Sequence, residues 1–96
     1  MAQLLDDSAI DEALVSLDGW RRVDNTIVRE VPVDGAAAED LETAVAKAAD
    51  ELNHHPVVDR TSGALRFVVW SHSAGGVTSK DIGLATRINE AITDLA

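Results

Sequence analysis

A proline ends the strongest helical pattern in this chain, and two histidines come directly before it. Residues Ala37 to Asn53 are predicted to form a helix, because their apolar side chains recur at the spacing of a single helix face. Those side chains are Leu41, Val45, Ala48 and Leu52. Pro56 lacks a backbone N–H and disfavours the helical conformation at the residue before it. The helix must therefore stop beside His54 and His55.

A shorter helix and two strands are predicted before the long helix. Ser8 and Asp11 have the spacing of a capping box, in which the serine hydroxyl caps the first turn, and Gly19 is expected to end this helix. Residues 20–23 and 26–31 are predicted to be strands, because β-branched residues flank an Asp-Asn turn.

A second pair of strands and a last helix are predicted after the proline. Residues 57–58 form a short strand, 60–63 a turn and 64–72 a longer strand, followed by a flexible loop at 73–76. Side chains of a strand alternate between its two faces. One face of the longer strand carries Leu65, Phe67, Val69 and Ser71, and the other carries Ala64, Arg66, Val68, Trp70 and His72. The segment that begins at Thr78 is predicted to open the last helix.

The predicted order is therefore α-β-β-α-β-β-α, within a single domain that spans residues 1–96. Strands that follow one another as hairpins pair antiparallel, and three helices would cover one face of the resulting four-stranded sheet. The fold class is α+β. Only 3 % of the residues are aromatic, so the core is built from small aliphatic side chains, and burial of surface against a second copy is expected.

Composition argues against several classes of function. A net charge of −9 opposes contact with the phosphates of nucleic acids and with an anionic membrane surface. The chain contains no cysteine, which excludes disulfides, cysteine-bound zinc and thiol nucleophiles. No segment approaches the roughly 18 apolar residues of a membrane span, and the first residues do not resemble a signal peptide. A cytoplasmic protein is expected.

The three histidines are the best candidates for chemistry, because imidazole exchanges protons near neutral pH. Asp50 precedes His54 by four residues, so a continuing helix would place both on one face and let the carboxylate orient that ring. Asp81 follows Thr78 by three residues, at the acidic position of a capping box. Its carboxylate could cap the helix, orient a histidine, or do both.

Other roles for these residues stay open. A single histidine at a helix end often serves only to offset the partial negative charge there. Adjacent histidines chelate a metal poorly, so no metal is expected. Trp70 shares a strand face with His72, where it could stack on a flat ring or belong to the core or an interface.

The arrangement of these residues resembles the signature of the pterin-4a-carbinolamine dehydratase family. That signature contains an acidic residue, three further residues, His-His-Pro, an aromatic residue, a third histidine and a later aspartate. The matching positions here are Asp50, His54-His55-Pro56, His72 and Asp81. The resemblance spans nearly the whole chain and is strongest from residue 50 to residue 84.

The resemblance implies the α+β fold given above and a homodimer or homotetramer. It implies loss of water from a 4a-hydroxytetrahydropterin to give the quinonoid dihydropterin, in the recycling of the pterin used by aromatic amino acid hydroxylases. No metal or organic cofactor is implied. His54 and His72 would act as the acid and the base, His55 would position the substrate, and Asp81 would orient a histidine.

The chain departs from the family pattern at several aromatic positions. Val58 and Ser62 stand where the family often has aromatic residues, and residues 32–40 contain no Phe. Trp70 could replace some of the lost stacking surface. Alternatively, the pocket takes a different pterin, such as one of molybdopterin metabolism. A further alternative is a non-catalytic member that acts as a dimerisation or regulatory module through its helices.

Overall fold

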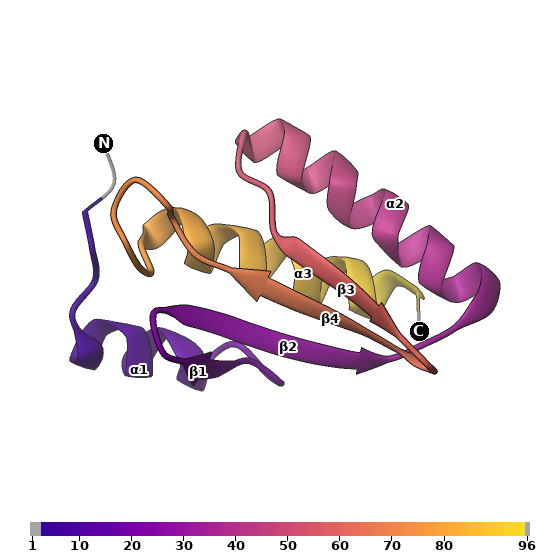
Figure 1. Ribbon diagram of the computed structural model, residues 1–96, viewed down its shortest axis with the longest axis horizontal. Helices are drawn as coiled ribbons and strands as arrows, with labels where there is room; N and C mark the ends of the chain where they lie inside the picture. Colours follow the sequence, from indigo (N-terminus) through magenta and orange to yellow (C-terminus); the bar gives the residue numbers. More distant parts are fainter. Residues whose placement is uncertain (1–2, 96) are drawn as a thin grey trace.

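The computed structural model describes residues 3–95 and shows three helices and a four-stranded antiparallel sheet (Figure 1). Residues 1, 2 and 96 of the predicted domain lie outside the described part. The elements in chain order are α1 (Asp7–Val15), β1 (Arg21–Val23), β2 (Thr26–Pro32), α2 (Gly35–Leu52), β3 (Val57–Thr61), β4 (Ala64–Val69) and α3 (Ser79–Leu95). This confirms the predicted order and the α+β class. Within residues 3–95, no helix is both long and apolar enough to cross a membrane.

The strands lie in the order β1-β2-β4-β3, so β4 is central and β3 is an edge. β2 pairs with β4 from Ile27 opposite Val69 to Pro32 opposite Ala64. β3 pairs with β4 along its whole length, with Val57 opposite Val68. One end of the β3–β4 hairpin is closed by the turn at residues 62–63. The other end is open, and α2 ends beside it.

One face of the sheet carries the hydrophobic core, as predicted. Leu65, Phe67 and Val69 of β4 are fully buried there, together with Ile27 of β2. All three helices contribute to the same cluster of buried side chains. The contributed residues include Ile10, Leu41, Val45, Ala49, Leu84, Ala85 and Ile88. The core therefore fixes α2 and α3 against the strand that leads to the third histidine.

The predicted start of the first helix is wrong. Asp6, in an extended conformation, is the N-cap, and its carboxylate accepts a hydrogen bond of 2.8 Å from the backbone N–H of Ala9. Ser8 lies inside the helix, and Asp11 is exposed and forms no capping box. Aspartate caps a helix as well as serine does, and the cap at Asp6 starts the helix two residues before the predicted position. The helix ends at Val15, ahead of Gly19.

Two strand boundaries also differ from the prediction. β3 extends to Thr61, because the register with β4 satisfies its backbone groups, and the turn shrinks to residues 62–63. β4 ends at Val69 rather than at residue 72. Ser71 instead forms an isolated bridge with Gly76, which closes the loop between them.

Candidate active site

The end of α2 determines where the histidine pair points. Asn53 adopts the left-handed conformation, with φ 52° and ψ 42°. Its N–H donates to the carbonyl of Asp50 at 3.2 Å, and the N–H of His54 donates to the carbonyl of Ala49 at 3.0 Å. This is a Schellman motif, which satisfies the last carbonyls of a helix and turns the chain sharply.

Because of this turn, the two histidines face different carboxylates. His54 Nε2 lies 2.5 Å from Oδ1 of Asp81, and His55 Nε2 lies 2.8 Å from Oδ1 of Asp50. The predicted contact between Asp50 and His54 is therefore wrong. The prediction assumed that the helix continues through His54, whereas the left-handed Asn53 rotates that side chain away and brings His55 back over the last turn.

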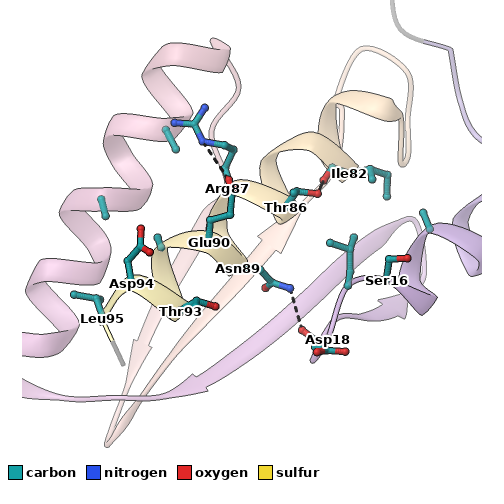
Figure 2. Close-up of a pocket in the computed structure, with 15 residues that line it drawn as sticks. Ser16, Asp18, Ile82, Thr86, Arg87, Asn89, Glu90, Thr93, Asp94 and Leu95 are labelled. Carbon is teal, nitrogen blue, oxygen red and sulfur yellow. Dashed lines mark hydrogen bonds and ion pairs between the residues drawn. The ribbon is translucent and has the colours of Figure 1, made fainter.

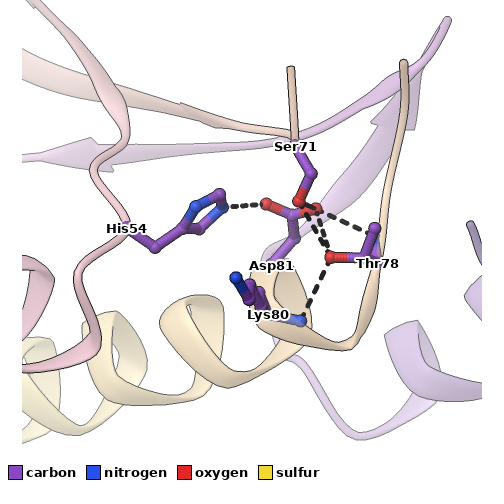
Figure 3. Close-up of polar contacts among 5 residues, drawn as sticks. All are labelled: His54, Ser71, Thr78, Lys80 and Asp81. Atoms are coloured by element: carbon purple, nitrogen blue, oxygen red, sulfur yellow. Dashed lines mark hydrogen bonds and ion pairs between the residues drawn. The ribbon is translucent and has the colours of Figure 1, made fainter. Parts of the chain in front are cut away.

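Asp81 is the most enclosed charged group of the site, with no exposed surface. Its Oδ2 accepts hydrogen bonds from the backbone N–H of Thr78 at 2.8 Å and from the hydroxyl of Ser71 at 2.9 Å (Figure 3). The contact with Thr78 is the predicted capping contact at the start of α3. The same carboxylate thus caps a helix through one oxygen and contacts His54 through the other.

The segment after β4 places the third histidine. Ser71 points inward beside α3, and its N–H donates to the carbonyl of Gly76 at 2.9 Å. His72, next along the chain, is exposed, and its ring lies against that of Trp70, with 4.4 Å between ring centroids and 39° between planes. The predicted shared face of Trp70 and His72 is present.

All three histidines line one cleft of about 370 Å³. Its walls come from the end of α2, the segment after β4 and the start of α3. The complete lining is Asn53, His54, His55, Trp70, Ser71, His72, Ser73 and Lys80. The volume lies near the lower end of the range for small-molecule sites, which suits a bicyclic ring.

The donor set of the cleft suits proton transfer better than metal binding. Among residues 3–95, no group of three or more histidine, cysteine or acidic side chains is placed to hold a metal ion. His54 is largely buried, with 16 % of its side chain exposed, whereas 58 % of the His55 side chain is exposed. Two imidazoles in such different surroundings are suited to different tasks.

Several residues of the site were not predicted from the sequence. Lys80 and Asn53 line the cleft, and Ser71 binds Asp81. The sequence could have indicated Ser71, because it is the single polar residue at the end of an otherwise apolar strand face. Val58 and Ser62, which replace family aromatics, do not line the cleft; Val58 borders a separate cavity with His55 and Pro56.

An exposed ion pair joins α2 to α3 outside the lining of the cleft. The Arg87 guanidinium donates a hydrogen bond to the carboxylate of Glu51, the last residue but one of α2. This hydrogen bond lowers the pKa of Glu51 and raises the pKa of Arg87. The pair and the contact between His54 and Asp81 are two links between the end of α2 and α3.

A larger cavity of about 950 Å³ lies among the three helices (Figure 2). Its lining mixes apolar side chains with polar and charged ones. The apolar residues include Leu17, Ala44, Ala48, Ala91 and Leu95, and the charged residues are Asp18, Arg87, Glu90 and Asp94. None of the three histidines lines it. We call it the helical groove.

Comparison with known proteins gives a consistent result. Residues 3–91 match the family model described as pterin 4 alpha carbinolamine dehydratase. A protein of Mycolicibacterium smegmatis, provisionally named pterin-4-alpha-carbinolamine dehydratase, is 35 % identical over 95 residues, which are 95 % of this chain and 98 % of that protein. A protein of the same provisional name from Nocardia farcinica is 40 % identical over 89 residues, covering 92 % and 94 % of the two chains.

A solved structure agrees with these sequence matches. The crystal structure named transcriptional coactivator/pterin dehydratase from Brucella melitensis superimposes with a TM-score of 0.86 at 33 % identity. The superposition covers 91 % of this chain and 96 % of that one. Because the family model matches residues 3–91, which are almost the whole chain, this chain belongs to the pterin 4 alpha carbinolamine dehydratase family.

Proposed function

We propose that this protein dehydrates a 4a-hydroxytetrahydropterin to the quinonoid dihydropterin and water. The observation that carries the proposal is the meeting of His54, His55 and His72 at one cleft, although they come from segments on either side of a β-hairpin. Family membership and the names of the relatives support the same activity. The reaction would return the pterin to a form used by aromatic amino acid hydroxylases, and its proposed setting is the cytoplasm.

The reaction requires two proton transfers. An acid protonates the 4a-hydroxyl as the bond between C4a and that oxygen breaks, and water leaves. A base removes the proton from ring nitrogen N5, and the electron pair of the N–H bond forms the double bond between N5 and C4a. Acid and base are regenerated when they exchange a proton, so no redox partner is needed. Imidazoles suit both steps at neutral pH.

We assign the two proton transfers to His54 and His72. His54 is fixed by Asp81, which suits a group that must act from one position. His72 is exposed, so it can exchange protons with solvent after each turnover. His55, held by the exposed Asp50, would position the hydroxyl or the ring, and Trp70 would stack on the pterin plane.

The test is a dehydration assay. A pterin-dependent hydroxylase generates the 4a-hydroxypterin, and its decay is followed by absorbance with and without this protein. Wild type should accelerate the decay, and His54→Ala and His72→Ala should each lose about 10²-fold or more of that acceleration. Lys47→Ala, an exposed change on α2 outside the cleft lining, is the matched control. Equal decay with wild type, His72→Ala and buffer would exclude the proposed reaction.

A second candidate function is self-association through the helices, without catalysis. The helical groove favours it, because it is a concavity among three helices with alanine and leucine side chains in its lining, on a small domain whose core contains few aromatics. The occupant that we propose is a second copy of this chain, as expected from its thin core. The groove and the histidine cleft have no lining residue in common, so self-association can be tested separately from catalysis.

A further inference from the structure

We infer that Ser71 and Thr78 are positioning residues that act on His54 through Asp81, and that His54 exchanges its proton through Nδ1. The contacts that carry this inference involve no substrate. Its meaning for catalysis rests on the function proposed above, in which His54 is the acid or the base.

The hydrogen bonds around Asp81 admit one consistent direction. The N–H of Lys80 donates to Thr78 Oγ1 at 3.2 Å, so the Thr78 hydroxyl can donate to Ser71 Oγ at 2.8 Å. The Ser71 hydroxyl then donates to Asp81 Oδ2 at 2.9 Å. The Thr78 hydroxyl also lies 3.4 Å from that oxygen, which is a much longer contact. Each donor is thus used once, and the chain of hydroxyls ends on the carboxylate.

Two donors fill Oδ2 of Asp81, because the backbone N–H of Thr78 binds it as well, at 2.8 Å. A carbonyl-type oxygen has two lone pairs, so Oδ2 has no room for a proton of its own. Donors on that oxygen and the N-terminal end of α3 both stabilise a negative carboxylate. The proton between Asp81 Oδ1 and His54 therefore belongs to the imidazole.

This assignment determines which nitrogen of His54 is available. Nε2 carries the proton that it donates to Asp81 at 2.5 Å. In the neutral ring the other nitrogen, Nδ1, is then an acceptor. In the charged ring, Nδ1 carries the proton that can leave. Among residues 3–95, no hydrogen-bond partner occupies Nδ1. The serine protease triad uses the same logic with the nitrogens exchanged, since its aspartate holds Nδ1 and leaves Nε2 to react.

Backbone hydrogen bonds close the loop that begins at Ser71. The carbonyl of Ser71 accepts a hydrogen bond from the N–H of Gly75 at 2.9 Å, in addition to the bridge between Ser71 and Gly76. A closed loop therefore holds the hydroxyl of Ser71 toward Asp81 while His72, the next residue, faces the cleft.

The first experiment needs neither substrate nor variants that fold poorly. Histidine ¹⁵N NMR of the wild-type protein, at a pH where His54 is neutral, reports which ring nitrogen carries the proton. We expect Nε2 of His54 to be protonated and Nδ1 to be bare. A neutral His54 with its proton on Nδ1 would overturn the inference, whatever the activity of the protein. Assignment comes from the signals lost in His54→Gln.

The second experiment tests the hydroxyl of Ser71. In Ser71→Ala, we expect a mixture of His54 tautomers in the ¹⁵N spectrum and a kcat lowered about tenfold, with KM changed less than kcat. Ser71→Thr retains the hydroxyl and should keep the wild-type tautomer. Thr43→Ala is the matched control, because its hydroxyl binds only the carbonyl of Glu39 on the exposed surface of α2. An unchanged tautomer and an unchanged kcat in Ser71→Ala would contradict the positioning role.

The two proposals fail in different ways. If wild type does not accelerate dehydration but shows the expected tautomer, which Ser71→Ala disturbs, the proposed reaction fails and the positioning of His54 stands. If wild type is active but Ser71→Ala leaves the tautomer and kcat unchanged, the positioning inference fails and the reaction stands.

Discussion

The carboxylate of Asp50 binds the imidazole of His55, five residues along the chain, at 2.8 Å. This contact exists because α2 ends at Leu52 and Asn53 turns the backbone in the left-handed conformation. The same turn directs His54 toward Asp81. The position of both histidines therefore depends on the conformation of a single asparagine.

Replacing that asparagine should cost stability and activity together. Asn53→Ala should lower the free energy of unfolding by about 1 kcal/mol, because a Cβ-bearing residue without a polar side chain adopts the left-handed conformation with difficulty. Asn53→Gly, which adopts it freely, is the matched control and should be at least as stable as wild type. Urea denaturation and the dehydration assay check both changes. Equal stability of the alanine and glycine variants would mean that the turn carries no strain.

Removing the charge of Asp81 should affect activity far more than removing that of Asp50. In Asp81→Asn, the donors that bind Oδ2 in the wild type should bind the amide oxygen, so the amide N–H₂ turns toward His54. The N–H₂ then donates to Nε2, which favours the proton on Nδ1. We expect kcat to fall by about 10²-fold or more. Asp50→Asn changes an exposed pair and should leave kcat within a few fold. Steady-state kinetics of the two isosteric variants make the comparison, and similar losses in both would contradict the assigned roles.

Truncating Trp70 should weaken binding rather than the chemical step. Trp70→Ala removes the proposed stacking surface, so KM should rise by roughly two- to tenfold. Trp70→Phe retains a flat ring and should lie between wild type and the alanine variant. A kcat that falls while KM stays constant would instead show that Trp70 acts through its contact with the His72 ring.

The ion pair between Glu51 and Arg87 should make stability depend on acid pH. The pKa of Glu51 in the folded protein lies below 4.5, so its stabilising effect is present above about pH 4.5 and is lost as the pH falls through the lowered pKa. Wild type should therefore melt at a higher temperature than Glu51→Gln at neutral pH, and the difference should vanish in acid. Glu90→Gln, whose carboxylate is 3.8 Å from Arg87, should show a smaller difference. Thermal melts from neutral to acid pH measure the difference in melting temperature between wild type and each variant.

A charged side chain in the helical groove should disrupt self-association. Ala44→Arg places a guanidinium on the wall formed by α2, and light scattering should then report the 10.2 kDa monomer, whereas wild type should be a dimer or tetramer. Ala36→Arg, on exposed surface of the same helix, should retain the wild-type mass. An Ala44→Arg variant with the wild-type mass would exclude the groove as the interface.

The element order and the buried face of the sheet could be predicted because they depend on local periodicity. Alternation along residues 64–71 identified the inward side chains of β4, and the stripe at Leu41 and Val45 identified α2. Strand lengths were less predictable. β3 continues to Thr61 because it has a partner in β4, and pairing of this kind cannot be read from one segment.

The sequence by itself determined that α2 must stop at the histidine pair, because Pro56 and its steric effect on His55 are local. It also determined that Asp81 would cap α3, since the capping contact spans only three residues. Only the tertiary structure decided which carboxylate each imidazole meets. His54 and Asp81 are 27 residues apart, and the Schellman turn at Asn53 and the packing of α2 on α3 bring them together. No periodicity in the sequence encodes a contact that depends on both the turn at Asn53 and the packing of the two helices.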